Sequence, residues 1–415
     1  MSSPSVVAPA PSKPSRHAVG FVLLVVFLDM VGLGLILPVL PELIETVGHM
    51  TLDQAARIGG LMFAAFSLAQ FLFAPMMGAL SDRFGRRPLL LIAVAGLGVD
   101  YLFHALAPTV GWLFVGRVIA GVCGASHVIA NAYLADITPP EGRARAFGLM
   151  GAAFGLGFVL GPAIGGLLGE LGPRVPFWVA AGISAANFLY GLFVLPESLP
   201  QDRRRAFRLR EANPLGVLEV FARYKGVLPL AAVFSVYFFG SAVYPAIWSF
   251  WGMAKFGWSE AMVGVSLAAF GIVWALFQGV LTGPAVRLWG EPRAALIGLI
   301  IGVVVCAGYG MATGIVAVVV LLFIHGPEGF VHPMLSAMMS RAVPEDAQGA
   351  LQGGLSGAMN LMMLLGTLFF TQVFGYFLSE AAPVRTPDAA YFVAAGVLGL
   401  ALVLYLPQWR RLRDA

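Results

Sequence analysis

Charged residues are scarce in this chain. Of its 415 residues only 11% are Asp, Glu, Lys or Arg, whereas 59% are apolar, and the mean hydropathy is +0.87. Ordinary soluble domains carry roughly 25% charged residues. The charges are too few to cover the surface of a soluble protein of this length. We therefore expect lipid rather than water to surround most of the chain.

Cysteine is almost absent, and the motifs of enzymatic and ATP-driven chemistry are missing. The two cysteines, Cys123 and Cys306, lie in apolar stretches and lack the paired spacing of zinc or redox sites, which favours a packing role. No nucleophile stands with a base, and no GxxxxGK[ST] loop is present. These absences argue against an enzyme, and we expect neither a metal nor a cofactor.

Long runs without charge recur along the chain, and many reach the roughly 20 residues that a helix needs to cross a bilayer. Membrane strands are disfavoured, because their segments span about 10 residues of alternating polarity. The predicted fold class is an all-α integral membrane protein with twelve transmembrane helices. The predicted helices are 19–40, 58–80, 88–107, 110–135, 146–169, 175–196, 227–254, 261–282, 293–312, 315–341, 349–378 and 388–407.

The distribution of Lys and Arg predicts which side of the membrane each loop faces. If both termini are cytoplasmic, Arg57, Arg174, Lys255 and Arg385 lie outside and Arg117 lies within a span, which leaves 20 of the 25 basic residues inside. An excess of basic residues in cytoplasmic loops is the rule for membrane proteins. We expect both termini in the cytoplasm, and the net charge of +4 requires no nucleic-acid partner.

A basic linker, residues 197–226, divides the chain into two halves. Six predicted spans lie in residues 19–196 and six in 227–407, with tails at 1–18 and 408–415; the first tail is rich in Pro and Ser and is expected to be disordered. GALSDRFGRRP begins at Gly78 and GPAVRLWGEPR at Gly283, 205 residues later, and each follows the second span of its half. Transporters built from repeated halves show such symmetry and bind substrate between the halves.

Three motifs of the first half carry a family resemblance: GALSDRFGRRP at 78–88, GRVIAGVCGASHVIANAYLADIT at 116–138 and GLGFVLGPAIGG at 155–166. Over nearly the whole chain the sequence resembles the major facilitator superfamily, and within it the drug:proton antiporters of the bacterial tetracycline efflux group. The resemblance implies two six-helix halves and transport driven by a proton gradient. It also implies that the first motif latches the cytoplasmic side of the halves, through Gly78, Asp82, Arg83, Gly85, Arg86 and Arg87.

The third motif resembles the pattern of the superfamily's antiporters. Gly157, Gly161 and Gly165 recur every four residues, with Pro162 among them. Residues at this spacing share one face of a helix, and without side chains they let a neighbouring helix approach closely. Helix packing is therefore the predicted role of this stripe.

Ionisable residues within the predicted spans are the candidates for proton coupling, because such groups in lipid must face a partner or a wet cavity. Arg117 in span four is expected to pair with Asp29 in span one, which lies in a stretch similar to the start of tetracycline exporters. Asp100 in span three matches another acid of that group, with a structural salt bridge as the alternative. Gln70 and Asn131 are expected either to line the cavity or to hydrogen-bond between helices, and His104, one turn after Asp100 on the same face, is a further candidate substrate contact.

The second half departs from the tetracycline group. Those exporters carry an acid in span nine and a histidine in span eight, and Gly302 and Trp274 stand at the matching positions here. Span ten instead contains HGPEGFVHP, in which His325, Glu328 and His332 are spaced to share one helix face. The glycines and prolines of this stretch should interrupt the helix, which membrane proteins tolerate where the interruption is buried or lines a cavity.

Three interpretations of this cluster are open. It is a replacement proton site centred on Glu328, a metal site of the two histidines and the acid, or an internal hydrogen-bond network. We favour the proton site. Metal binding is the weakest of the three, because it needs a fourth ligand and no other Cys/His pair has ligand spacing.

The predicted function is export of a small amphipathic compound in exchange for protons, by alternating access, in the bacterial cytoplasmic membrane. The expected partners are the substrate, protons and the bilayer, and the expected functional unit is a monomer. A metabolite or siderophore transporter of the same fold is the alternative, whereas an enzyme or a channel is disfavoured. Aromatic residues of spans seven and eight, with the histidines of span ten, are the expected substrate contacts: Tyr237, Tyr244, Trp248, Trp274, His325 and His332.

Overall fold

The computed structural model describes residues 16–124, 126–204, 221, 223–224, 226–344 and 347–414. These residues form helices joined by short connections, and none of them lies in a strand. The predicted all-α membrane fold is confirmed. Residues 1–15 of the first tail and residues 205–220 of the linker lie outside the described residues.

The N-terminal half contains six crossings. Two departures from prediction are the short helix α2 after span one and the division of span four into α5 and α6. The elements are α1 (Arg16–Ile36), α2 (Leu40–Gly48), α3 (Leu52–Phe84), α4 (Arg86–Leu106), α5 (Val110–Cys123), α6 (Ser126–Ile137), α7 (Pro140–Gly169) and α8 (Val175–Val194), followed by a 3-10 turn at Gln201–Arg203.

The C-terminal half also crosses six times. Eleven stretches of the described chain are long and apolar enough to span a membrane, and one of them, Glu260–Met311, holds two crossings because the backbone turns at Gly290. The elements are α10 (Leu228–Ser241), α11 (Val243–Phe256), α12 (Glu260–Ala275), the π-helix η4 (Leu276–Leu281), α13 (Thr282–Met311), α14 (Ile315–His325), the 3-10 helix η5 (Gly326–Phe330), α15 (Val331–Arg341), α16 (Gln348–Leu378) and α17 (Ala389–Asp414).

The fourth span of each half is interrupted at an equivalent place. In span ten the interruption is η5, which confirms the break predicted from its glycines and proline. In span four it follows Cys123, and Gly124 lies 205 residues before Gly329 of η5. Gln70 donates a hydrogen bond of 2.9 Å to the Gly124 carbonyl. A side chain of α3 thus binds the backbone at the interruption in span four.

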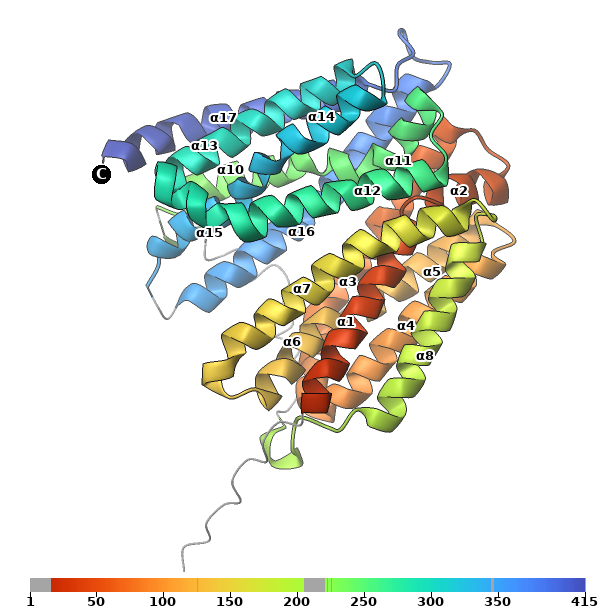
Figure 1. Cartoon of the computed structure of the whole chain (residues 1–415), viewed down its shortest axis with the longest axis vertical. Coiled ribbons are helices and arrows are strands. Elements are labelled where there is room, and N and C mark those ends of the chain that lie inside the picture. Colours follow the sequence, from red (N-terminus) through yellow and green to blue (C-terminus); the bar gives the residue numbers. More distant parts are fainter. Residues whose placement is uncertain are drawn as a thin grey trace, which may run out of the picture.

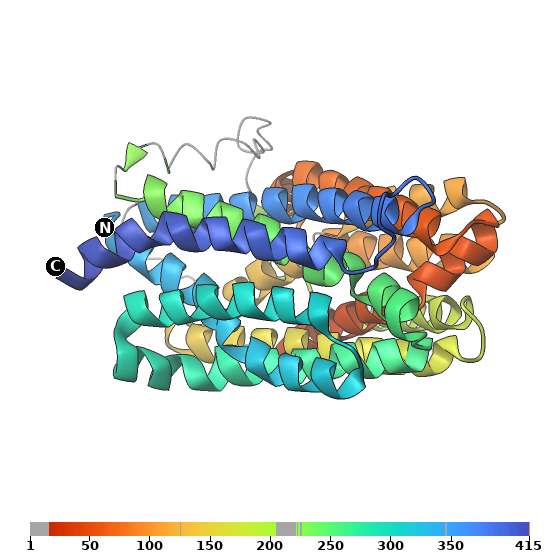
Figure 2. The same ribbon diagram turned by 90° about the horizontal axis from the view of Figure 1, so that it is seen from above.

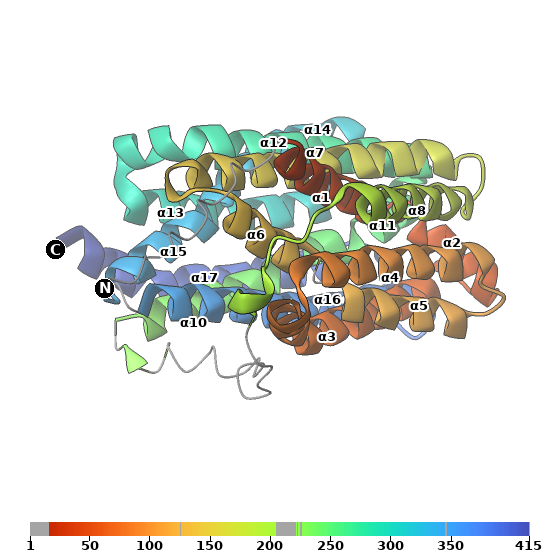
Figure 3. The ribbon, with the colours of Figure 1, turned by 90° about the horizontal axis from the view of Figure 1, so that it is seen from below.

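The two halves meet at one end of the molecule and diverge toward the other (Figure 1). We call the end of the molecule at which α1 begins and α17 ends the terminal end. Helix α3 also ends there, and α7 and α16 begin there. The opposite end, where α3 begins and α16 ends, is the distal end. Figure 2 shows α13 beside α17 in the C-terminal half, and Figure 3 shows α1 flanked by α7 and α8 in the N-terminal half.

Contacts between the halves concentrate at the distal end. Arg57 of α3 donates a 2.9 Å hydrogen bond to the carbonyl of Gly375 near the end of α16, and Gln372 donates to the carbonyl of Arg57. Glu170, directly after α7, accepts a hydrogen bond from the backbone of Ala261 in the first turn of α12. All three contacts join elements of different halves, so the described conformation is closed at its distal end.

Candidate functional site

A buried ion pair joins spans three and four. Asp100 of α4 and Arg117 of α5 are in ion-pair contact, and both side chains are buried. His104 Nδ1 lies 3.0 Å from Asp100 Oδ1, and the His104 ring stacks on Phe177. The helical hairpin explains the pairing, because Asp100 and Arg117 are nearly equally far along the chain from its turn at residues 107–109.

The expected pairing of Arg117 with Asp29 is wrong. Asp29 of α1 is 7% exposed and forms a hydrogen bond with the side chain of Ser126, the first residue of α6. No Lys or Arg of the described chain forms an ion pair with it; the guanidinium of Arg117 is committed to Asp100. Asp29 is thus a buried carboxyl group with a neutral partner, whereas the charge of Asp100 is balanced.

The three polar residues predicted to line a cavity differ in their surroundings. Gln70 is half-buried and hydrogen-bonded to the interruption in span four, which is the interhelical alternative. His104 is fully buried against Asp100 and Phe177, so in this conformation it has no free surface for a substrate. Asn131 of α6 is half-buried, and its predicted role in the cavity stays a prediction.

A second buried carboxylate lies in the C-terminal half. Glu328 of η5 is fully buried, and its Oε2 accepts a 2.8 Å hydrogen bond from the hydroxyl of Tyr244 on α11. The Nε2 atom of His325 lies 3.1 Å from the same oxygen, and the Tyr237 hydroxyl is also within hydrogen-bonding reach of the carboxylate. Cys306 in turn donates to the Tyr244 hydroxyl. Among the described residues no Lys or Arg pairs with Glu328.

Glu328 and His325 lie next to the two positions, Gly302 and Trp274, at which the sequence departs from the tetracycline group. A Cβ atom on Gly302 of span nine would lie 3.1 Å from the carboxyl carbon of Glu328. In span eight, the ring centroid of Trp274 lies 6.0 Å from that of His325. An acid and a histidine are therefore present at this place in space, but both are supplied by span ten.

His332 does not join the other two residues of its motif. Its ring packs against Phe234 and Phe238 of α10, whereas His325 and Glu328 face α11 and α13. The prediction that all three share one face is wrong, because η5 is wound as a 3-10 helix and changes the direction of the residues that follow. Within the described residues, no three His, Cys, Asp or Glu side chains are grouped as metal ligands.

The aromatic residues predicted as substrate contacts are mostly packed inside the C-terminal half. Tyr237, Tyr244 and Trp248 are each at least nine-tenths buried, and Trp248 donates to the Ser266 hydroxyl at 2.8 Å. His325 is fully buried as well. Of this set only Trp274 and His332 are half-buried, so the predicted aromatic wall does not line an open cavity in this conformation.

The glycine stripe of α7 has the predicted packing role. A Cβ on Gly161 would lie 2.7 Å from the carbonyl oxygen of Val31, and one on Gly157 would lie 2.7 Å from that of Phe27. Gly165 meets the backbone of Leu35 in the same way. Pro162 lies against Gly34 on the same helix α1. Four positions along α7 thus let its backbone touch that of α1.

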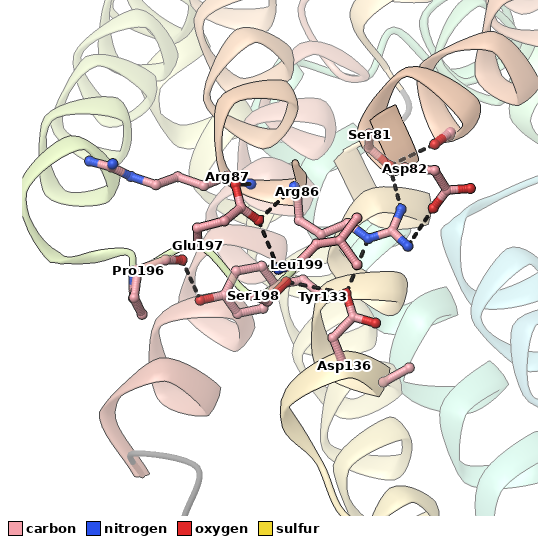
Figure 4. Close-up of polar contacts among 12 residues, drawn as sticks. Ser81, Asp82, Arg86, Arg87, Tyr133, Asp136, Pro196, Glu197, Ser198 and Leu199 are labelled. Carbon is pink, nitrogen blue, oxygen red and sulfur yellow. Dashed lines mark hydrogen bonds and ion pairs between the residues drawn. The ribbon is translucent and has the colours of Figure 1, made fainter. Parts of the chain in front are cut away.

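Three residues of the predicted latch, Asp82, Arg86 and Arg87, belong to a polar cluster at the terminal end (Figure 4). Arg86 bridges Asp82 at 2.5 Å and Asp136 of α6 at 3.2 Å, and it also donates to Ser81. Gly85 separates α3 from α4 with a φ of 109°, a conformation that favours glycine. Gly78 accepts a hydrogen bond from Ser81 through its carbonyl, whereas Arg83 packs on Phe84.

Among the described residues, the contacts of this cluster join the N-terminal half to itself and to the start of the linker, and none reaches the C-terminal half. Arg87 donates to the carbonyl of Leu192 at the end of α8. Glu197, which the sequence analysis did not single out, accepts hydrogen bonds from the backbone of Arg86 and Arg87 and so caps the start of α4. Its position directly after span six, on the same side as the loop after span two, is the signal that could have found it. A latch between the halves stays a prediction for a conformation in which the terminal ends meet.

The C-terminal half repeats the central ion pair of this cluster with both charges reversed. Glu291 and Arg341 are in ion-pair contact, and they lie 205 residues after Arg86 and Asp136. The preceding glycine, Gly290, also has a positive φ, of 72°. The internal symmetry predicted from glycine spacing therefore includes this ion pair: equivalent positions of the two halves are paired, but the acidic and basic residues are exchanged.

Comparisons with known proteins agree with these features. The profile of the Major Facilitator Superfamily matches residues 22–366 and 229–414. The tetracycline resistance protein, class C, of Escherichia coli is 40% identical, over 96% of this chain and 97% of its own length. The class G protein of Vibrio anguillarum is 39% identical over 86% and 91%.

Solved structures share the fold. The crystal structure of a bacterial homologue of the human lysosomal transporter Spinster, described as inward-facing and unoccupied, superimposes with a TM-score of 0.76 at 17% identity. The alignment covers 96% of this chain and 98% of that one.

Proposed function

Because this chain belongs to the major facilitator superfamily, we propose that it exports a small amphipathic organic compound in exchange for protons. As a member of that family it is a multi-pass membrane transporter and not an enzyme. The proposal places it in the cytoplasmic membrane of a bacterium, with both termini in the cytoplasm, as the distribution of Lys and Arg favours. It requires the proton gradient and no cofactor.

The observation that carries proton coupling is that each half has a carboxyl group within its membrane-spanning helices, Asp29 or Glu328, that pairs with no Lys or Arg of the described chain. A carboxylate inside the membrane is costly, and it persists where it binds and releases a cation or a proton. Asp29 has a serine as its partner, and Glu328 has tyrosines and a histidine. Asp100 differs, because Arg117 balances its charge in place. We therefore assign proton exchange to Asp29 and Glu328, and a supporting role to the Asp100–Arg117 pair.

The arrangement of the halves supports alternating access. With the terminal end in the cytoplasm, contacts at the distal end close the outer side and the divergent helices face inward. At the closure, a cavity of about 50 Å³ lies between the halves, lined by residues such as Leu37, Phe63, Pro245 and Thr371. This space is too small for a drug-sized ligand, whose pockets measure roughly 300–1,000 Å³. Passage outward thus requires the distal contacts to separate.

The names of the relatives support a tetracycline-like drug as the exported compound. A metabolite or siderophore transporter of the same fold is the second candidate. The observation in its favour is that Gly302 and Trp274 replace the acid and the histidine that the resemblance implies in spans nine and eight. A screen of tetracyclines, unrelated drugs and siderophores in proteoliposomes separates the two, because only one class should be accumulated with an imposed pH gradient.

Glu328→Gln tests the proton role. The variant keeps a side chain of similar shape but removes the exchangeable proton, so gradient-driven transport should fall by about 100-fold or more, while substrate counterflow without a gradient persists. Glu380→Gln is the control, since this acid is exposed in a distal loop and paired with Arg385. Gradient-driven transport by Glu328→Gln at the wild-type rate contradicts the proposal.

A further inference from the structure

A line of three buried side chains runs through the C-terminal half toward the distal end. Tyr309 of α13 places its hydroxyl 3.4 Å from Nδ1 of His325, and Nε2 of His325 lies 3.1 Å from Oε2 of Glu328. All three side chains are no more than 1% exposed. The two nitrogens of one imidazole therefore face a phenol on one side and a carboxylate on the other.

The order of these residues along the helices gives the line its direction. Tyr309 lies two residues before the end of α13 at the distal end, and α14 starts from that end. His325 lies three residues, about one turn, closer to the distal end than Glu328. Beyond Tyr309, Lys255 Nζ lies 2.9 Å from the Gly310 carbonyl and 2.7 Å from Asp388. Lys255 and Asp388 are 14% and 17% exposed, so the line ends close to the distal surface.

We propose that Tyr309 and His325 form a relay that carries a proton from the distal side to Glu328. The inference rests on the proposed proton role of Glu328 and adds the route by which the proton arrives. In the described conformation the distal contacts between the halves are closed, so water does not reach Glu328 from that side through the space between them. A path inside the C-terminal half requires no separation of the halves.

The transfer balances at each atom. Neutral imidazole has one N–H donor and one acceptor nitrogen, and the neighbours of the ring fix which is which. With the Tyr309 hydroxyl donating to Nδ1, the N–H lies at Nε2, 3.1 Å from Oε2 of Glu328; the described geometry is not a hydrogen bond, so a small turn of the ring must align the N–H before transfer. The Nε2–H bond breaks as O–H forms on the carboxylate, and Nδ1–H forms as the phenolic O–H breaks. A proton from distal water restores the phenol, and the imidazole is left as its other neutral tautomer until the ring resets.

Other groups around this line bear on its behaviour. Tyr244 donates to the same oxygen of Glu328, and Cys306 donates to Tyr244. From α17, the ring of Tyr391 packs 5.5 Å from that of Tyr309, but its buried hydroxyl has no hydrogen-bond partner in the described structure. Two buried tyrosines thus lie side by side, and only the hydroxyl of Tyr309 contacts the imidazole.

This contrast supplies a matched pair of variants. Tyr309→Phe and Tyr391→Phe each remove one buried hydroxyl and keep the aromatic ring. The full-length protein is reconstituted in liposomes, and two rates are measured with the substrate found in the screen: transport driven by an imposed pH gradient, and counterflow at equal pH. We expect Tyr309→Phe to lower the gradient-driven rate about tenfold or more, with counterflow within about twofold of wild type. Tyr391→Phe should leave both rates near wild type.

The remaining outcomes overturn the relay. A Tyr309→Phe protein that matches Tyr391→Phe in gradient-driven transport shows that the hydroxyl carries no proton. Equal losses of both rates in Tyr309→Phe show a structural role of the hydroxyl instead. Glu328→Gln, measured alongside, separates this inference from the proposed function. If Glu328→Gln loses gradient-driven transport and Tyr309→Phe does not, the relay fails while the proton role of Glu328 stands; wild-type transport by Glu328→Gln removes both.

Discussion

Replacement of Arg117 by an uncharged residue tests which carboxylate its guanidinium neutralises. Its guanidinium contacts Asp100, whose side chain is completely buried, and the other ion-pair contact of that carboxylate among the described residues is with His104. Arg117→Met keeps much of the side-chain volume but leaves an uncompensated carboxylate inside the membrane. Breaking a buried pair by removing one partner costs about 3–5 kcal/mol. We expect the free energy of unfolding of Arg117→Met to fall by about this amount.

The double variant Arg117→Met/Asp100→Leu removes both charges. Replacing a whole buried pair with apolar residues is often close to neutral. The double variant should therefore be more stable than Arg117→Met alone, by about 2 kcal/mol or more. Arg117→Met/Asp29→Leu is the matched control, because it removes an acid that does not contact Arg117. No recovery is expected there.

The assay is reversible unfolding of the purified proteins in mixed micelles, with SDS as the denaturant. Two results refute the reasoning. A loss below about 1 kcal/mol in Arg117→Met means that Asp100 does not depend on this cation. Recovery in the Asp29 double variant, and not in the Asp100 one, means that the pairing expected from the sequence is the correct one.

Two further predictions concern helix contacts. Arg57→Ala removes the hydrogen bond to α16 that helps to close the distal end. It should therefore increase labelling, by an impermeant maleimide added outside, of a cysteine introduced at Leu37 in the cavity between the halves. Arg385→Ala, whose partner lies in its own half, should not, and equal labelling of the two variants argues against the closure. Gly165→Val places a side chain against the backbone of Leu35 and should destabilise the protein by about 1–3 kcal/mol. Gly155→Val is the control, because a side chain at this position of the same helix meets open space. Equal stability of the two variants, measured by SDS titration, rules out this packing argument.

The sequence predicted the spans well, because the length and apolarity of a crossing segment are set by the bilayer and not by other parts of the protein. It missed the break in span four. Glycine at position 124 permits a break, but the hydrogen bond that its carbonyl accepts comes from Gln70, 54 residues away on another helix. Such a partner is visible only after α3 and α5 are packed together. The π-helix η4 in span eight was missed for a related reason, since it packs against η5 of span ten.

The sequence identified the ionisable residues of the candidate site more reliably than it predicted which of them form ion pairs. Asp29, Asp100, Arg117 and Glu328 are all buried, as ionisable groups in apolar runs suggest. Which acid serves Arg117 was misjudged, although the symmetric distance of Asp100 and Arg117 from their shared turn was available in the sequence. Aromatic residues of span seven gave no such signal. Whether a tyrosine in an apolar helix faces a cavity or its own half depends on the rotation of that helix.

By itself the sequence determined that the chain crosses a membrane about twelve times, that it consists of two related halves and that a few ionisable groups lie within the apolar layer. These properties follow from composition and from spacing along the chain, because the bilayer acts on each helical segment separately. Only the tertiary structure decided that Asp29 pairs with no Lys or Arg of the described chain, and that span ten places His325 and Glu328 beside Trp274 and Gly302. Those outcomes depend on distances between separate helices, which no local pattern specifies.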